Sequence, residues 1–275
     1  MLRVVLLTFC VGVAAGFWGT PDWNHLKVTW DAADCYSSRG FADMPRTEKD
    51  AWREGWTMIS DCDDTPKFAG KRYVKDGDTA VVLIYDVNGY IAGIQAGFPP
   101  QPNNYPSPTL QNHPFVEDDG KQYITVYFTN PSGICSGGRT SDMFESEGTG
   151  SDMYIQNGTR PSDSTKVPKL ERNIGSTLWT KGHCFRTMGQ HYWYNLRKDQ
   201  SCDEFFPMFL LYNQGILDGF GWAFLANLTT STRYEHPRMT AFGYFLDPVP
   251  DCLYTQTSGT TTMHIYMSDP NYSFC

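Results

Sequence analysis

Histidines are concentrated in the C-terminal third of the chain, in segments with the composition of β-strands. Alternate side chains of a strand face the same way, so His191 shares a face with Trp193 and His264 shares one with Tyr266. Neighbouring strands can each supply one imidazole to copper, zinc or iron, and nearby methionines favour copper. The pattern predicts a metal site formed by His191, His236 and His264, which the carboxylate of Glu235 would complete.

The same histidines also fit a purely structural interpretation, in which buried rings donate hydrogen bonds to backbone carbonyls. The sequence has no His-x-His pair and no His-Glu-x-x-His motif, so spacing does not require a metal. Both interpretations therefore stay open at this point.

Two aromatic runs, FGWAF (220–224) and FGYFL (242–246), offer walls for a small-molecule pocket. Such pockets combine apolar aromatic surface with a few polar groups. We predict that Trp193, Trp222 and Tyr266 line this pocket, with ordinary core packing as the alternative.

Other catalytic chemistry has less support, and no catalytic residue is assigned. The G-x-S-x-G motif of a serine nucleophile is missing. The Gly/Ser loop around Cys135 and the carboxylates of Asp203, Glu204 and Glu235 are the remaining candidates, for a thiol nucleophile and for glycoside hydrolysis.

The first sixteen residues have the pattern of a secretory signal peptide. Arg3 precedes an apolar run from Val4 to Ala14 that is too short to cross a bilayer. Small residues predict cleavage after Gly16, with Ala15 as the alternative, and a buried strand is the competing interpretation. No later apolar run reaches the ~18–20 residues of a membrane helix. We expect a secreted, extracellular protein without a membrane span.

Seven cysteines remain after that cleavage, and none forms a C-x-x-C motif. An oxidising compartment predicts three disulfides. We expect local pairs, Cys35–Cys62, Cys184–Cys202 and Cys252–Cys275. Cys135 would then stay free or join two chains in a disulfide-linked dimer.

Three sequons follow the N-glycosylation pattern, at Asn157, Asn227 and Asn271. Asn157 is the strongest candidate because it lies in a polar turn, whereas Asn271 lies very near the end of the chain.

The charge of the chain argues against nucleic acid as a partner. The net charge is −8, and binding to phosphates requires a basic surface. Aromatic residues make up 15 % of the chain, which indicates a packed globule rather than a disordered matrix polymer.

Short apolar runs separated by Gly, Pro and Asp predict a mainly β domain over residues 17–275. We expect an antiparallel sandwich or open barrel with long loops and one or two short helices. The expected helix covers 47–56 with Thr47 as its cap. A hairpin is expected between 80–85 and 90–95, because Asn88-Gly89 suits a type I′ turn. Further strands are expected at 71–75, 122–128, 184–188, 191–195, 207–212, 220–226, 239–246 and 261–267.

The proline-rich segment 98–114 is a predicted surface loop. We expect it to cross one end of the sandwich rather than to separate two domains.

Three stretches together carry a resemblance: VVLIYDVNGYIAGIQ, GHCFRTMGQHYWY and the string FLLYNQG…YEHP…TMHIYM. They resemble uncharacterised secreted proteins of aquatic invertebrates. The resemblance implies a secreted, single-domain, disulfide-bonded protein and transfers no catalytic residue.

Two functions follow as hypotheses. The first is an extracellular binding protein, for a small molecule or for the extracellular matrix. The second is a metal-dependent oxidoreductase or oxygenase of the copper or luciferase type, which would use the three histidines.

Overall fold

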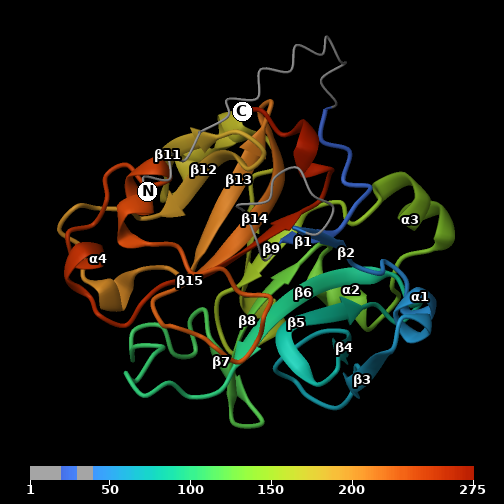
Figure 1. Ribbon diagram of the computed structural model, residues 1–275. Coiled ribbons are helices and arrows are strands. Elements are labelled where there is room, and N and C mark those ends of the chain that lie inside the picture. Colours follow the sequence, from blue (N-terminus) through green and yellow to red (C-terminus); the bar gives the residue numbers. More distant parts are fainter. Residues whose placement is uncertain (1–19, 30–39) are drawn as a thin grey trace, which may run out of the picture.

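Two antiparallel β-sheets lie face to face and form the framework of the molecule (Figure 1). The computed structural model describes residues 20–29 and 40–275. The predicted signal peptide and Cys35 lie outside these ranges. The predicted fold class is confirmed, and because both sheets are open the architecture is a sandwich and not a closed barrel.

The seven-stranded sheet is built mostly from the C-terminal half of the chain. Its order is β11-β12-β13-β14-β15-β1-β2. The strands are β1 (Lys27–Thr29), β2 (Phe41–Asp43), β11 (Trp179–Phe185), β12 (Gly189–Tyr194), β13 (Met208–Asn213), β14 (Ile216–Phe224) and β15 (Thr261–Tyr266).

The eight-stranded sheet is built from residues 56–167. Its order is β10-β9-β8-β6-β5-β4-β3, with β7 paired to β8 off this path. The strands are β3 (Trp56–Ser60), β4 (Lys71–Lys75), β5 (Asp78–Tyr85), β6 (Ile91–Phe98), β7 (Val116–Asp118), β8 (Lys121–Tyr127), β9 (Met153–Gln156) and β10 (Ser164–Val167).

Helices are short and lie in the connections. The α-helices are α1 (Glu48–Arg53), α2 (Pro131–Ile134), α3 (Ser141–Glu147) and α4 (Cys252–Thr255). The 3-10 helices are η1 (Pro161–Asp163), η2 (Glu171–Ser176), η3 (Cys202–Glu204), η4 (Met239–Tyr244) and η5 (Pro270–Tyr272).

Alternation along β14 separates two packed faces of the seven-stranded sheet. Phe220, Trp222 and Phe224 face the opposite sheet, where Phe224 lies 5.2 Å from Phe98 between ring centroids. The other face of β14 is also buried, because a long connection crosses it. Burial of both faces explains why β13 and β14 read as nearly continuous apolar runs.

The predicted hairpin is present as β5 and β6, but its turn differs from the expected type. Only Gly89 has a positive φ, of 84°, whereas a type I′ turn needs two such residues. The buried carboxylate of Asp86 organises the turn instead, accepting hydrogen bonds from the backbone N–H groups of Asn88 and Tyr90 at 3.0 Å.

Helix α1 begins as predicted, since Thr47 Oγ1 accepts a hydrogen bond from Asp50 N at 3.2 Å. The predicted strand at 239–246 is wrong, because that segment contains the 3-10 helix η4. Phe242 and Leu246 are buried and Phe245 is half-buried, and the last two follow Phe242 by three and four positions, which is helical spacing.

The proline-rich segment closes one end of the sandwich, as expected. Asn103 Nδ2 donates to Leu225 O at 3.4 Å, and Ser107 Oγ donates to Asp203 O at 2.6 Å. The segment follows a strand of one sheet and contacts residues beside strands of the other, so it joins the two layers.

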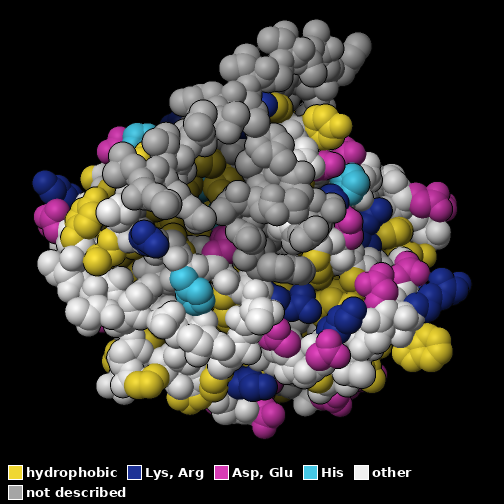
Figure 2. Space-filling model, in the orientation of Figure 1, with side chains coloured by type: hydrophobic (Ala, Val, Ile, Leu, Met, Phe, Trp, Pro, Cys, Tyr) yellow, Lys and Arg dark blue, Asp and Glu magenta, His cyan; other side chains and the backbone are white. Residues whose placement is uncertain are grey.

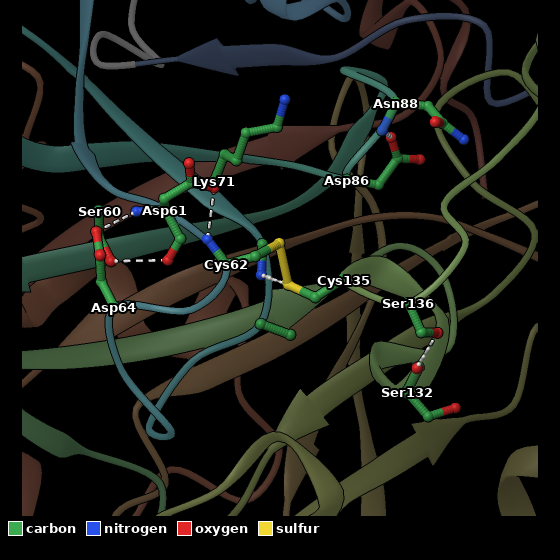
Figure 3. Close-up of a disulfide and its surroundings, with 12 residues drawn as sticks. Ser60, Asp61, Cys62, Asp64, Lys71, Asp86, Asn88, Ser132, Cys135 and Ser136 are labelled. Atoms are coloured by element: carbon green, nitrogen blue, oxygen red, sulfur yellow. Dashed lines mark hydrogen bonds between the residues drawn. A yellow bond between two sulfur atoms is a disulfide. The ribbon is translucent and has the colours of Figure 1, made fainter.

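Three disulfides are present, but the predicted pairing is wrong. The pairs are Cys62–Cys135, Cys184–Cys275 and Cys202–Cys252, separated by 73, 91 and 50 residues. The sandwich brings distant segments together, whereas the prediction assumed local pairs. Cys135 is therefore not available to link two chains, since it is bonded to Cys62 (Figure 3).

Backbone contacts explain two of these pairs. Gly70 N donates to Cys135 Sγ at 3.0 Å, so the loop after Cys62 lies against the end of α2. The C-terminal segment passes the β11–β12 turn, where Thr187 N donates to Ser273 O at 3.0 Å. That contact brings Cys275 to Cys184.

Basic and acidic side chains are interspersed over the face drawn in Figure 2. Within residues 20–29 and 40–275, no helix has both the length and the apolar character needed to cross a membrane.

Candidate functional site

The outer face of the seven-stranded sheet is covered by the connection 225–260, which joins β14 to β15 and carries η4 and α4. In Figure 1 this connection is the orange-to-red trace around α4. A cavity of about 400 Å³ lies between the sheet and the connection. It is lined by Met188, His191, Trp193, Phe205, Phe209, Ala223, Leu225, Tyr234, Glu235, His236, Pro237, Phe242, Phe245, Leu246, Leu253, Thr260, Thr262 and His264.

The sheet side of this cavity, the floor, follows from strand register. Trp193 on β12 lies opposite Phe209 on β13, Phe209 lies opposite Gly221 on β14, and Gly221 lies opposite His264 on β15. All four therefore belong to one row on the outer face.

Gly221 lies in the middle of this row and leaves the space that the Phe209 ring occupies. A Cβ at Gly221 would lie 2.1 Å from Phe209 Cζ, so the ring occupies the space that a side chain would fill. Over the glycine, the Phe209 ring centroid comes within 4.9 Å of Trp193 and 5.1 Å of His264.

A bulge in β11 fixes the covering connection to the floor. The register shifts between Lys181 and Cys184, so two residues of β11 oppose His191. The backbone groups at the bulge point toward the site: His183 N donates to Phe245 O at 3.1 Å. Trp193 Nε1 donates to the same carbonyl at 3.0 Å.

Glu235 joins the connection to β15 through a single antiparallel bridge. Its backbone exchanges two hydrogen bonds with Thr262, both of 2.9 Å. Across that bridge, Glu235 Oε2 accepts from Thr262 Oγ1 at 3.1 Å and from His264 Nδ1 at 2.9 Å. The glutamate therefore fixes the orientation of the His264 ring, and His264 Nε2 has no hydrogen-bond partner among the residues described.

His191 is a fully enclosed, neutral histidine. Its Nδ1 lies 3.1 Å from His183 O, and a carbonyl only accepts, so Nδ1 carries the proton. Burial, and then the neighbouring His264, lower the pKa of His191 to about 3. The ring is uncharged near neutral pH and Nε2 retains its lone pair.

Three buried polar atoms on cavity-lining residues of the covering connection lack partners among the described residues. They are Tyr234 Oη, Glu235 Oε1 and Thr260 Oγ1. Buried polar groups are nearly always hydrogen-bonded, because an unmade hydrogen bond costs roughly 1–3 kcal/mol. All three residues line the cavity, and the three atoms themselves are buried within its wall.

The three predicted metal ligands line this same cavity, but they do not form a metal site. No group of three or more His, Cys, Asp or Glu within the described ranges is arranged to hold an ion. The Nδ1 atoms of His191 and His264 are already hydrogen-bonded, and their ring centroids are 6.5 Å apart. His236 is exposed at the edge of the cavity, with Nδ1 lying 3.4 Å from Thr261 Oγ1.

Of the three predicted pocket residues, Trp193 lines the cavity. Trp222 points from the opposite face of β14 into the core, and Tyr266 lies behind His264, with the two rings stacked at 6.2 Å. Phe205, Phe209 and Leu253 also line the cavity, and no motif in the sequence marks them. The helical spacing of Phe242 and Phe245 was the available signal for the covering wall.

The other catalytic candidates lie apart from this cavity. Cys135 is in a disulfide, and Asp203 and Glu204 do not line the cavity. Glu204 is half exposed and forms an ion pair with Arg197 at 3.0 Å.

Comparisons with known proteins give no functional assignment: no family model matches the chain, and neither a curated protein nor a solved structure matches it.

Proposed function

We propose that this protein is an extracellular, disulfide-bonded glycoprotein that binds a small, largely apolar molecule between the seven-stranded sheet and the connection 225–260. The main support for this proposal is the cavity of about 400 Å³. Its walls are largely aromatic and include polar atoms that have no hydrogen-bond partner among the described residues. Its volume lies within the ~300–1,000 Å³ of small-molecule sites.

The extracellular part of the proposal rests on the three disulfides and on the signal-like N-terminus. Of the three sequon asparagines, Asn227 and Asn271 are exposed, while Asn157 is half-buried with its side chain hydrogen-bonded to His113. Asn271 Nδ2 donates to Asp269 Oδ1 at 2.9 Å, so Asn227 is the better placed of the two to carry a glycan.

Small-molecule binding is preferred over the two rival functions. Matrix association is not favoured by any particular surface within residues 20–29 and 40–275. A metal-dependent oxidoreductase would need a set of converging ligands, and no group of three or more His, Cys, Asp or Glu among the described residues is arranged to hold an ion.

Binding of a neutral, environment-sensitive dye tests the proposal. N-phenyl-1-naphthylamine becomes fluorescent in apolar surroundings, and we expect saturable binding of one molecule per chain. Two substitutions should fill the cavity from opposite walls, Ala223→Phe from the floor and Leu253→Trp from the connection. Each should weaken dye binding by at least about tenfold, which corresponds to ~1.4 kcal/mol.

Trp52→Ala is the control, because Trp52 is an exposed aromatic residue outside the cavity, with 75 % of its surface accessible. It should leave dye binding unchanged. Unfolding midpoints of all variants show whether they are folded. If folded variants with a filled cavity bind the dye as well as the unmodified chain, the cavity is not the binding site.

A further inference from the structure

The cavity wall contains several hydrogen-bond acceptors, together with the hydroxyl groups of Tyr234 and Thr260, which can donate as well as accept. The Nδ1–H of His191 is used by His183 O, which leaves Nε2 as an acceptor. His264 in its neutral form also presents Nε2, because its Nδ1–H is used by Glu235. Glu235 Oε1 is a buried acceptor with no partner among the residues described. The cavity therefore suits a ligand that donates hydrogen bonds.

Among the described residues that line the cavity, one side chain is acidic. It is Glu235, and the side chain is only 10 % exposed. Among the described lining residues there is no lysine or arginine. The other titratable groups that face the cavity are His191, His236 and His264, together with the Tyr234 hydroxyl, whose pKa burial raises. A buried carboxylate is costly unless its oxygens are paired, and here Thr262 and His264 bond Oε2 while Oε1 has no partner among the described residues.

Aromatic rings complete the environment of a cation. Five rings line the cavity besides those of the histidines and Tyr234, from Trp193, Phe205, Phe209, Phe242 and Phe245. Trp193 is packed against two of the others, with centroid distances of 5.8 Å to Phe205 and 4.9 Å to Phe209. The faces of aromatic rings attract cations, and tryptophan attracts them most strongly.

We infer that the ligand of this cavity is a protonated organic amine with an aromatic or apolar body, its ammonium group donating to Glu235 Oε1. This inference rests on the proposed function, since it specifies the ligand of the same cavity. Carboxylic acids are excluded by the charge of Glu235, and uncharged alcohols should bind more weakly because they offer one donor and no charge.

Three ligands of matched shape test the inference by calorimetry on the mature chain. Tryptamine, tryptophol and indole-3-propionate carry an ammonium, a hydroxyl and a carboxylate group, respectively, on the same indole-ethyl body. We expect tryptamine to bind at least about tenfold more tightly than tryptophol, and indole-3-propionate to show no binding.

Glu235→Gln removes the charge with little change in shape. It should weaken the binding of tryptamine by at least about tenfold and change the affinity for tryptophol by less than about twofold. Glu145→Gln is the matched control, since it makes the same change on the exposed surface of α3, and should leave both ligands unaffected. Retained tryptophol binding shows that the cavity of the variant is intact.

The two proposals fail in different ways. Equal affinity for amine and alcohol, tightest binding of the acid, or equal loss of both ligands in Glu235→Gln would overturn the amine inference and leave a binding cavity. Dye binding without binding of any indole would also overturn it. If neither the dye nor any indole binds, both proposals are wrong. If Glu235→Gln does not fold, the ranking of the three ligands on the unmodified chain still decides.

Discussion

His191 is 1 % exposed and lies between the bulge of β11 and the Phe209 ring, so a charge on its ring would be poorly solvated. Its pKa is therefore lowered to about 3, whereas an unfolded chain takes up this proton near pH 6.5. Between those pH values the unfolded state binds more protons, so the free energy of unfolding falls as the pH falls.

A substitution at this position should reduce the pH dependence of stability. We expect the unmodified chain to lose stability between pH 6.5 and 4.5 with a contribution from His191 of up to about 1.4 kcal/mol per pH unit. His191→Gln does not titrate, so its free energy of unfolding should fall less over the same interval. Urea unfolding at several pH values measures both slopes.

His183→Gln serves as the control for that comparison. The His183 side chain is exposed, and the contacts of this residue at the bulge are made by its backbone. The free energy of unfolding of His183→Gln should fall with pH as steeply as that of the unmodified chain. Equal slopes for His191→Gln and the unmodified chain would mean that His191 is protonated within the folded protein.

Strands β12 to β15 form the floor of the cavity, and their close approach depends on Gly221. The Phe209 ring above this glycine is held by Trp193 and His264, so it cannot move aside for a methyl group. We expect Gly221→Ala to lower the free energy of unfolding by about 1–3 kcal/mol and to weaken dye binding.

Gly243→Ala makes the same change in η4, where a new Cβ would have no heavy atom within 4 Å. It should alter stability by no more than about 0.5 kcal/mol. Thermal and urea unfolding of the two variants give the comparison. A Gly221→Ala chain as stable as Gly243→Ala would show that the packing of the floor is looser than described.

Sequence patterns predicted the strands of the floor correctly but not the covering connection, and the reasons are physical. Alternation correctly placed His191 with Trp193 and His264 with Tyr266 on shared faces, because strand geometry is local. It failed at 239–246, where apolar composition resembled a strand and the spacing of Phe242 and Phe245 was the better guide. Glu235 lies in a long connection and pairs with Thr262 of β15. A pairing between residues this far apart in the chain cannot be recognised from a short stretch of sequence.

At the scale of the whole molecule, the sandwich class was predictable but the cavity and the disulfide pairs were not. Short strands with Gly, Pro and Asp between them specify the class. Which face of a sheet a connection crosses depends on tertiary packing, and so does the pairing of Cys202 with Cys252. That disulfide links η3, next to Phe205, to α4, which contains Leu253, so it connects two walls of the cavity.

The extracellular assignment makes a prediction for the whole chain. When the chain is expressed with its own N-terminus in cultured animal cells, the protein should appear in the medium with Phe17 as its first residue. The six cysteines that form the three disulfides should give no reactive thiol. Intact mass should fall on enzymatic deglycosylation, and Asn227→Gln should remove one glycan.

Two results would contradict that assignment. One is retention of the chain inside the cells with its thiols reduced. The other is a secreted product whose mass does not change on deglycosylation, which would remove the glycoprotein part of the proposal and leave secretion in place.

The crystal structure of the mature chain grown with N-phenyl-1-naphthylamine tests the central claim most directly. The account predicts one dye molecule between the floor and the connection 225–260, in contact with Trp193 and Phe245 and within reach of Glu235. A cavity that holds only ordered water while the dye lies elsewhere on the protein, or a cavity closed by the collapse of Phe242 and Phe245 onto Phe209, would contradict it.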